Sequence, residues 1–257
     1  MSKLKVTIVS LIILVFVVAG CSLKNHFSQN DEEKWNNQPT ISANKSARKK
    51  KSVHPDDEAL QVVSTPEAIP VLINKNHTLP DGYRPTDLVY PDIPFTFEKK
   101  TEKRKLREKA ADAIENLFSG AKKDGVDLLG VSAYRSHEAQ TVLFNYYVSL
   151  DGYEAARTYS AIPGTSEHET GLAIDVTGGD GKCAAEDCFA GTPEAEWLEK
   201  HSAEYGFIIR YPNGKDDVTG YKYEPWHLRY VGKSIAKQIM NSGITLEEYL
   251  KATPVNN

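Results

Sequence analysis

The longest amphipathic pattern in the chain lies between residues 98 and 123. Leu106, Ala110, Ile114 and Leu117 recur there at helical spacing, and charged residues occupy many of the positions between them. Because this spacing places the apolar side chains on one face of a helix, the pattern predicts an amphipathic helix over the segment.

A second helix is expected from Ser136 to about Leu150, with the Ser136 hydroxyl capping its first turn. Its expected core face consists of four residues: Val142, Leu143, Tyr146 and Tyr147. A substrate-binding stripe is the alternative role for this face. Two pairs fit the capping box, in which a side chain at the helix start is followed three residues later by Glu: Asp151 with Glu154, and Thr245 with Glu248.

The clearest helix signals surround residues 193–205. Thr192 can cap this helix, Pro193 suits its first turn, and Gly206 suits its end. Three residues share one face of it: Trp197, Leu198 and His201.

Strand-like runs lie between these helices, at 71–73, 126–133, 172–176, 207–211 and 221–231. The run 126–133 would deliver Tyr134 and Arg135 to its C-terminal end. The runs follow one another without a regular strand–helix–strand alternation, which favours the α+β class.

The first twenty residues have the pattern of a secretory signal peptide. Lys3 and Lys5 precede an apolar run, 6–20, which is short for a membrane span. The small residues before Cys21 resemble a bacterial lipobox, which would make Cys21 a lipidated N-terminus. An uncleaved N-terminal anchor is the alternative, and both place the rest of the chain at the outer face of the bacterial cell membrane.

Residues 21–66 are polar and charged with almost no apolar periodicity, so we expect a disordered tether there. The basic run 48–51 could meet anionic headgroups or wall polymers, but flanking acidic residues nearly cancel its charge. We expect no metal role for His26 or His54. Residues 67–257 then form the folded domain, and the 40% hydrophobic content of the chain supports a core. A net charge of −4 argues against nucleic-acid binding.

His168 and Asp175 are the first candidates for metal ligands. Thr170 and Gly171 can turn the backbone between them, so both side chains could face one point. His227, in the run 221–231, offers a third ligand. Two histidines and one aspartate leave a fourth position for water, as in catalytic rather than structural zinc sites.

The residues Ser166, His168, Gly171, Ala173 and Asp175, followed by Glu224-Pro225-Trp226-His227, carry a family resemblance. They resemble the zinc D-alanyl-D-alanine carboxypeptidases of the VanY type and their L,D-carboxypeptidase relatives. Further matching positions are the run 132–136 with Gln140, Asn74-Lys75 and Leu79-Pro80. The resemblance covers roughly residues 70 to 245. It implies a small, mostly antiparallel sheet flanked by helices, with the zinc site on the sheet, as in the DD-peptidase/hedgehog-like fold.

The resemblance also implies roles. One Zn²⁺ per chain would be held by His168, Asp175 and His227, and Glu224 would be the catalytic base. Arg135 would polarise the scissile carbonyl. The expected substrate-binding residues are Ser166, Gln140, Tyr134 and Trp226. Structural roles are the alternatives: Glu224 paired with Lys222, Ser166 capping a turn, Gln140 facing solvent, and Trp226 in the core.

Cys183 and Cys188 lie in a Gly-rich insertion, and in an extracytoplasmic chain we expect a local disulfide. A second metal site is the alternative. His137 and His201 lie on predicted helices without carboxylates at a shared-site spacing, so we expect both to be structural.

The function implied is a zinc D,D-carboxypeptidase that removes the terminal D-Ala of peptidoglycan stem peptides, acting as a monomer. Three alternatives stay open: an L,D-carboxypeptidase on tetrapeptide stems, a peptidoglycan endopeptidase, and a non-catalytic wall-binding module. A degenerate module would tend to lose Glu224 or Arg135, and both are present.

Overall fold

Four antiparallel strands form the sheet at the centre of the fold. Their order is β5 (Leu128–Ser132), β6 (Ala173–Gly178), β8 (His227–Tyr230) and β7 (Phe207–Ile209). Two short pairs lie outside it: β1 (Gln61–Val62) with β2 (His77–Thr78), parallel, and β3 (Leu88–Val89) with β4 (Leu106–Arg107), antiparallel. This computed structural model describes residues 60–255, all within one compact unit. The predicted α+β class with a small, mostly antiparallel sheet is confirmed.

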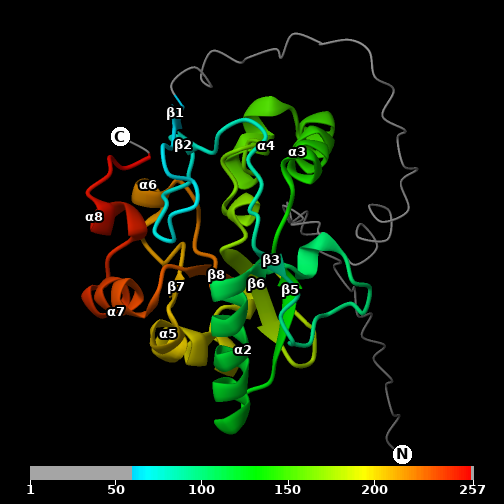
Figure 1. The fold of residues 1–257 in the computed structure, drawn as a ribbon, viewed down its shortest axis with the longest axis vertical. Coiled ribbons are helices and arrows are strands. Elements are labelled where there is room, and N and C mark those ends of the chain that lie inside the picture. Colours follow the sequence, from blue (N-terminus) through cyan, green and yellow to red (C-terminus); the bar gives the residue numbers. More distant parts are fainter. Residues whose placement is uncertain (1–59, 256–257) are drawn as a thin grey trace, which may run out of the picture. The chain divides into compact units, whose positions relative to one another are not determined.

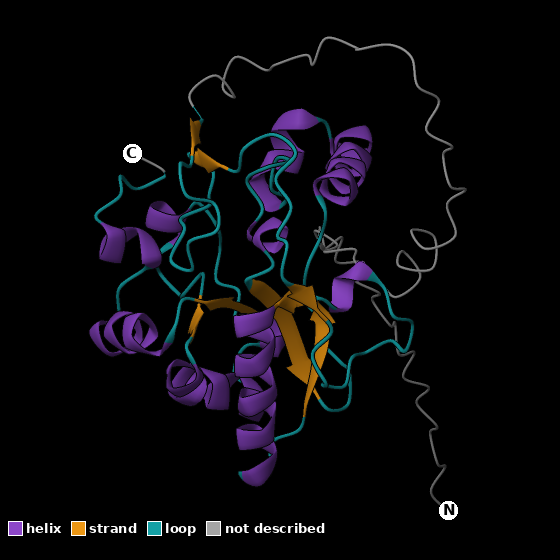
Figure 2. Cartoon of the chain, viewed as in Figure 1, coloured by secondary structure: helices purple, strands orange, loops and turns teal. Residues whose placement is uncertain are grey.

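Helices surround the sheet (Figures 1 and 2). They are η2 (Glu102–Arg104), α2 (Glu108–Lys123), α3 (His137–Asp151), α4 (Tyr153–Tyr159), η3 (Glu167–Thr170), η4 (Asp187–Phe189), α5 (Pro193–Tyr205), α6 (Asp216–Thr219), α7 (Lys233–Ser242) and α8 (Leu246–Leu250). Within residues 60–255, none combines the length and apolar character that a membrane span requires.

The main core lies between one face of the sheet and helices α2 and α5. Ile114 and Leu117 of α2, Ile174 of β6 and Leu198 of α5 are fully buried in it. Side chains alternate between the faces of a strand. The odd-numbered residues of β6, including Asp175, therefore face away from this core.

Helix α2 confirms the amphipathic pattern from Glu108 onward, but it does not extend back to residue 98. Leu106, assigned to the helix from its spacing, lies instead in β4, where it is fully buried beside the start of α2. The extended residues Leu106 and Arg107 pair with β3, so the helix begins only after that pairing ends.

The predicted core face of α3 is wrong, although Ser136 caps the helix as expected by accepting a hydrogen bond from the Ala139 amide. Val142 is 53% exposed and Tyr146 43% exposed. The helix buries only Gln140 and Phe144. It packs against the short helix α4 rather than a broad core, with the Phe144 ring edge-on to Tyr153 of α4.

The other helix signals have mixed outcomes. Thr192 caps α5 and Gly206 ends it, as predicted. Thr245 and Glu248 form the complete capping box. The capping box predicted for Asp151 and Glu154 does not form. Asp151 is the last residue of α3, and its carboxylate accepts a hydrogen bond from the Tyr159 hydroxyl at 2.6 Å.

Two predicted strands differ from the structure. The segment 71–73 is buried but pairs with no strand among residues 60–255, and the Arg229 guanidinium donates to the Val71 carbonyl instead. The run 221–231 becomes a strand only at His227. Before it, the His227 amide donates to the Glu224 carbonyl at 3.1 Å, which closes a turn with Pro225 and Trp226 at its centre.

The signal segment, Cys21 and the tether as far as residue 59 lie outside the described residues. Within them, Gln61–Val62 already pairs with His77–Thr78. Val63 packs against the main core. The folded part of the chain therefore extends to positions before the boundary expected at residue 67.

Candidate metal centre

Two of the three candidate ligands are opposite one another in the sheet. Asp175 of β6 and His227 of β8 are paired in the antiparallel register. Residues that are directly opposite project from the same face. Asp175 faces away from the core that Ile174 and Val176 fill, so both polar side chains project from the other face.

The third ligand comes from the turn before β6. His168 is a residue of η3, and Gly171 ends this turn in the left-handed conformation with φ 67°. A Cβ at Gly171 would lie 2.8 Å from the Leu88 side chain, so both the conformation and the space favour glycine. The reversal returns the chain into β6 and places His168 beside Asp175, as the sequence predicts.

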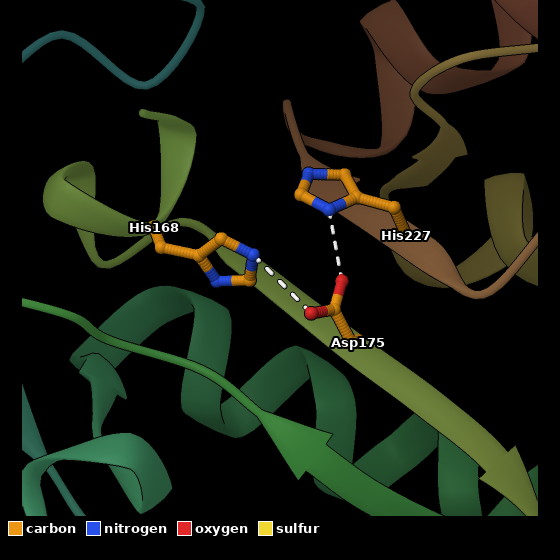
Figure 3. A group of neighbouring side chains, drawn as sticks. All are labelled: His168, Asp175 and His227. Atoms are coloured by element: carbon orange, nitrogen blue, oxygen red, sulfur yellow. Dashed lines mark hydrogen bonds and ion pairs between the residues drawn. The ribbon is translucent and has the colours of Figure 1, made fainter. Parts of the chain in front are cut away.

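The Asp175 carboxylate lies between the two imidazoles (Figure 3). Its Oδ2 is 3.3 Å from His168 Nε2, and its Oδ1 is 2.9 Å from His227 Nδ1. All three residues are buried, and one nitrogen or oxygen from each lies within 4.8 Å of the others. Tetrahedral zinc with bonds of about 2.0–2.1 Å separates its ligand atoms by about 3.3 Å. The donor types and spacing therefore fit zinc.

The electrostatics of these residues also suit a cation. Burial alone would raise the pKa of Asp175, but the two histidines outweigh it and hold the pKa well below its usual range. Burial likewise opposes a positive charge on His227, yet the neighbouring carboxylates of Asp175 and Glu167 raise its pKa to about 9. The surroundings of His227 thus favour positive charge.

Glu224 lies beside this centre, just before the turn that leads into β8. Its amide donates to the Tyr211 carbonyl at 3.0 Å. Burial raises the pKa of the Glu224 carboxyl to about 7, with His227 opposing the shift and Asp175 supporting it. Lys222, the alternative partner, instead binds Asp187 at 2.7 Å. Glu224 is therefore a carboxylate poised to exchange a proton near neutral pH.

Arg135 is held next to the ligands. Its amide donates to the His168 carbonyl at 3.2 Å, and its Nη1 donates to Gln140 Oε1 at 2.9 Å. Gln140 Nε2 donates to the Ala161 carbonyl at 2.6 Å. Gln140 is buried, so the solvent-facing alternative is wrong. Because both ends of its amide are engaged, the structure places Gln140 as a support for Arg135.

Three predicted substrate-binding residues are less accessible than expected. Tyr134 is buried, and burial together with Glu102 raises the pKa of its hydroxyl to about 12. Trp226 belongs to the main core rather than a pocket wall, because it occupies the centre of the turn that folds onto that core. Ser166 is buried just before η3, and its side chain makes no capping hydrogen bond there.

The remaining candidates lie apart from the centre. Cys183 and Cys188 form a disulfide with a Cα–Cα distance of 5.5 Å. His137 Nδ1 is 2.9 Å from Glu169, and His201 Nδ1 is 2.9 Å from Glu204. Neither histidine belongs to the His168–Asp175–His227 group.

Sequence reasoning missed a cluster that we call the buried charge network: Glu167, Arg210, Arg229 and Glu247. The side chains of all four are fully buried. Glu167 Oε1 accepts from Arg210 Nε at 2.7 Å and from Arg229 Nη1 at 2.6 Å. The available signal was the presence of arginines inside or beside apolar strand segments, where a charge must be paired.

A small antiparallel sheet with a His–Asp–His group on one face defines an α+β protein with a candidate mononuclear metal site. The VanY family, described as D-alanyl-D-alanine carboxypeptidase, matches residues 103–233. The chain belongs to this family.

Three similar proteins illustrate the relationship. YodJ of Bacillus subtilis (strain 168), provisionally named a carboxypeptidase, is 41% identical over 256 residues, 94% of each chain. The solved LdcB LD-carboxypeptidase is 47% identical with a TM-score of 0.73, covering 76% of this chain and 91% of its own. A glutamate-to-alanine mutant of the D,D-pentapeptidase VanY, solved with Zn(II), is 32% identical with a TM-score of 0.58, covering 71% and 98%.

Proposed function

We propose that this chain is a zinc-dependent carboxypeptidase that releases the C-terminal D-alanine from peptidoglycan stem peptides. The observation that carries the proposal is the buried group of His168, Asp175 and His227 with Glu224 beside it. The zinc complex of a VanY relative supports the choice of metal. A bound zinc supplies a Lewis acid that activates water and polarises the peptide carbonyl.

The side chains around this group can perform the rest of the reaction. Glu224, with its pKa raised to about 7, accepts the proton from the attacking water and passes it to the leaving amine. Arg135, aligned by Gln140, stabilises the negative charge that develops on the carbonyl oxygen. The peptide bond is hydrolysed to one free D-alanine and a stem shortened by one residue.

The D,D and L,D reactions differ in the residue before the cut. The sequence resemblance implies D,D cleavage of pentapeptides. Identity to the LD-carboxypeptidase is 47%, however, and identity to the D,D-pentapeptidase is 32%. We therefore place the L,D reaction on tetrapeptides first. The D,D reaction is the second candidate, supported by the family description.

A product analysis decides between these reactions. The zinc-loaded full chain is incubated with matched tetrapeptide and pentapeptide stems, and the products are identified by mass spectrometry. We expect faster D-alanine release from the tetrapeptide, by at least about tenfold, because a site shaped for one configuration misplaces the other carbonyl. Faster release from the pentapeptide would make the enzyme D,D-specific, and internal cleavage would make it an endopeptidase.

Chelation provides the control for the metal. Removal of zinc should abolish D-alanine release, and stoichiometric zinc should restore it, because zinc is proposed to activate the attacking water. Unchanged release after verified removal of metal would overturn the zinc mechanism while leaving the substrate assignment intact.

We also propose that the chain is a lipoprotein at the outer face of the membrane. The support is the basic and apolar pattern of residues 1–20 and the small residues before Cys21. Such an anchor would keep the enzyme near newly made stem peptides. Incorporation of labelled palmitate into the native chain, but not into Cys21→Ala, would support it, and equal labelling of both would contradict it.

A further inference from the structure

The two ring nitrogens of His227 face two different carboxylates, those of Asp175 and Glu167. Nδ1 faces Asp175 Oδ1 at 2.9 Å, which makes Nδ1 the nitrogen directed at the candidate metal position. Nε2 points the opposite way, toward Glu167 Oε2 at 3.6 Å. Both Nε2 and Oε2 are buried, and within the described residues neither has a hydrogen-bond partner. Two buried polar atoms thus face each other just beyond hydrogen-bond distance.

His168 shows how a contact at one ring nitrogen fixes which nitrogen of a metal-binding histidine carries the proton. His168 directs Nε2 at Asp175, and its Nδ1 lies 2.7 Å from the Ala133 carbonyl. A carbonyl can only accept, so Nδ1 of His168 carries the proton and Nε2 is left with its lone pair. This is how a backbone acceptor fixes the tautomer of a metal-binding histidine. His227 needs the mirror arrangement, with the proton on Nε2 and the lone pair on Nδ1.

We propose that Glu167 is the positioning residue that holds His227 in this tautomer and orientation through Nε2–H···Oε2. The inference rests on the zinc peptidase function proposed above. A shift of a few tenths of an ångström would bring the 3.6 Å contact into the usual range for a hydrogen bond.

The buried charge network explains why Glu167 can hold this position. Both guanidinium groups bind its other oxygen, Oε1, which leaves Oε2 directed at His227. Arg210 is in turn bound by both oxygens of Glu247 of α8, at 2.6 and 3.0 Å. Arg229 donates to the carbonyls of Ile69 and Val71. The carboxylate is thus fixed by segments from both ends of the folded chain.

Glu167→Gln makes the proposal testable because it keeps the shape of the side chain. The two arginines require an acceptor, so the glutamine carbonyl takes the place of Oε1 and its NH₂ faces His227 Nε2. Two donors then face each other unless the imidazole proton moves to Nδ1. That tautomer blocks the nitrogen directed at the metal.

Glu247→Gln is the matched control. It removes the same charge from the same buried network, but Glu247 faces Arg210 and Asn74 rather than His227. Zinc affinity is measured for the full native chain and both variants by competition with a chelator. We expect Glu167→Gln to weaken zinc binding by about 10–100-fold. Glu247→Gln should bind zinc nearly as tightly as the native chain, because Arg229 still binds Oε1 of Glu167 in this variant. We expect this even where its melting temperature falls equally.

Nitrogen NMR of the imidazoles gives a second readout that needs no variant. In the zinc-loaded native chain, His227 should carry a slowly exchanging proton on Nε2. Zinc bound through Nε2, or an unprotonated Nε2, would overturn the proposal even if Glu167→Gln failed to fold. Equal zinc affinity in all three proteins, or equal weakening in both variants, would also overturn it. If the native chain bound no zinc at all, the proposed function itself would fail.

Discussion

Glu224→Ala should lower the turnover of D-alanine release by about two to four orders of magnitude while zinc stays bound. Only proton transfer and water orientation are removed, because Glu224 is outside the group of three candidate ligands. The pKa of about 7 matches a group that takes and returns a proton at neutral pH. The zinc-loaded Glu224→Ala variant would still bind the peptide but would hydrolyse it slowly.

The comparison variant is His227→Ala, which should lose the metal as well as the activity. Zinc content and turnover are measured on the same preparations, with Glu196→Ala, a change on the exposed face of α5, as the surface control. If Glu224→Ala lost its zinc as His227→Ala does, Glu224 would be a ligand and the role assigned to it would be wrong.

The parts of the site that follow from local sequence were predictable. Asp175 is in a strand that alternates apolar and polar residues, and the turn at Gly171 precedes it. The pairing of Asp175 with His227 then needs their two strands to be neighbours in the register that sets these residues opposite each other. The caps at Ser136 and Thr192 are likewise local, because each side chain binds an amide three residues later.

Features that depend on long-range packing were not predictable in this way. The face of α3 carrying Val142 and Tyr146 looks apolar, but both side chains are exposed among the described residues, and α3 packs against the short helix α4. The network around Glu167 joins residues 43 and 62 positions apart in the sequence, so no short motif reveals it. Burial of a charge is decided by the partners that the fold brings to it.

Gln140 shows how the same limit affects a functional residue. Its place near Arg135 in the sequence fits a substrate-binding role, but both ends of its amide are engaged by the protein. The sequence could not reveal the contact with the Ala161 carbonyl, which occupies the NH₂ group. The role of Gln140 therefore depends on that of Arg135, and the two can be separated by experiment.

Arg135→Lys should lower kcat/KM by about 10²–10³-fold, the loss that follows removal of one preorganised donor to a developing oxyanion. A lysine retains the positive charge but not the planar group that binds Gln140 Oε1 and lies beside Ser132. Zinc content should be unchanged, because Arg135 is outside the candidate ligand group. An equal loss of zinc and activity would show that Arg135 supports the metal site rather than the reaction.

A double-mutant cycle then tests how Gln140 acts. Gln140→Ala alone should cause a smaller loss of kcat/KM, because Arg135 is present but less well held. If Gln140 acts only through Arg135, adding Gln140→Ala to Arg135→Lys should lower kcat/KM almost no further. The Arg135→Lys variant has no guanidinium for Gln140 to align. Additive losses, measured as kcat/KM on the same stem peptide with matched zinc content, would mean that Gln140 contacts the substrate independently. That result would restore the substrate-binding role predicted from the sequence and require the Gln140 amide to release the Ala161 carbonyl when peptide binds.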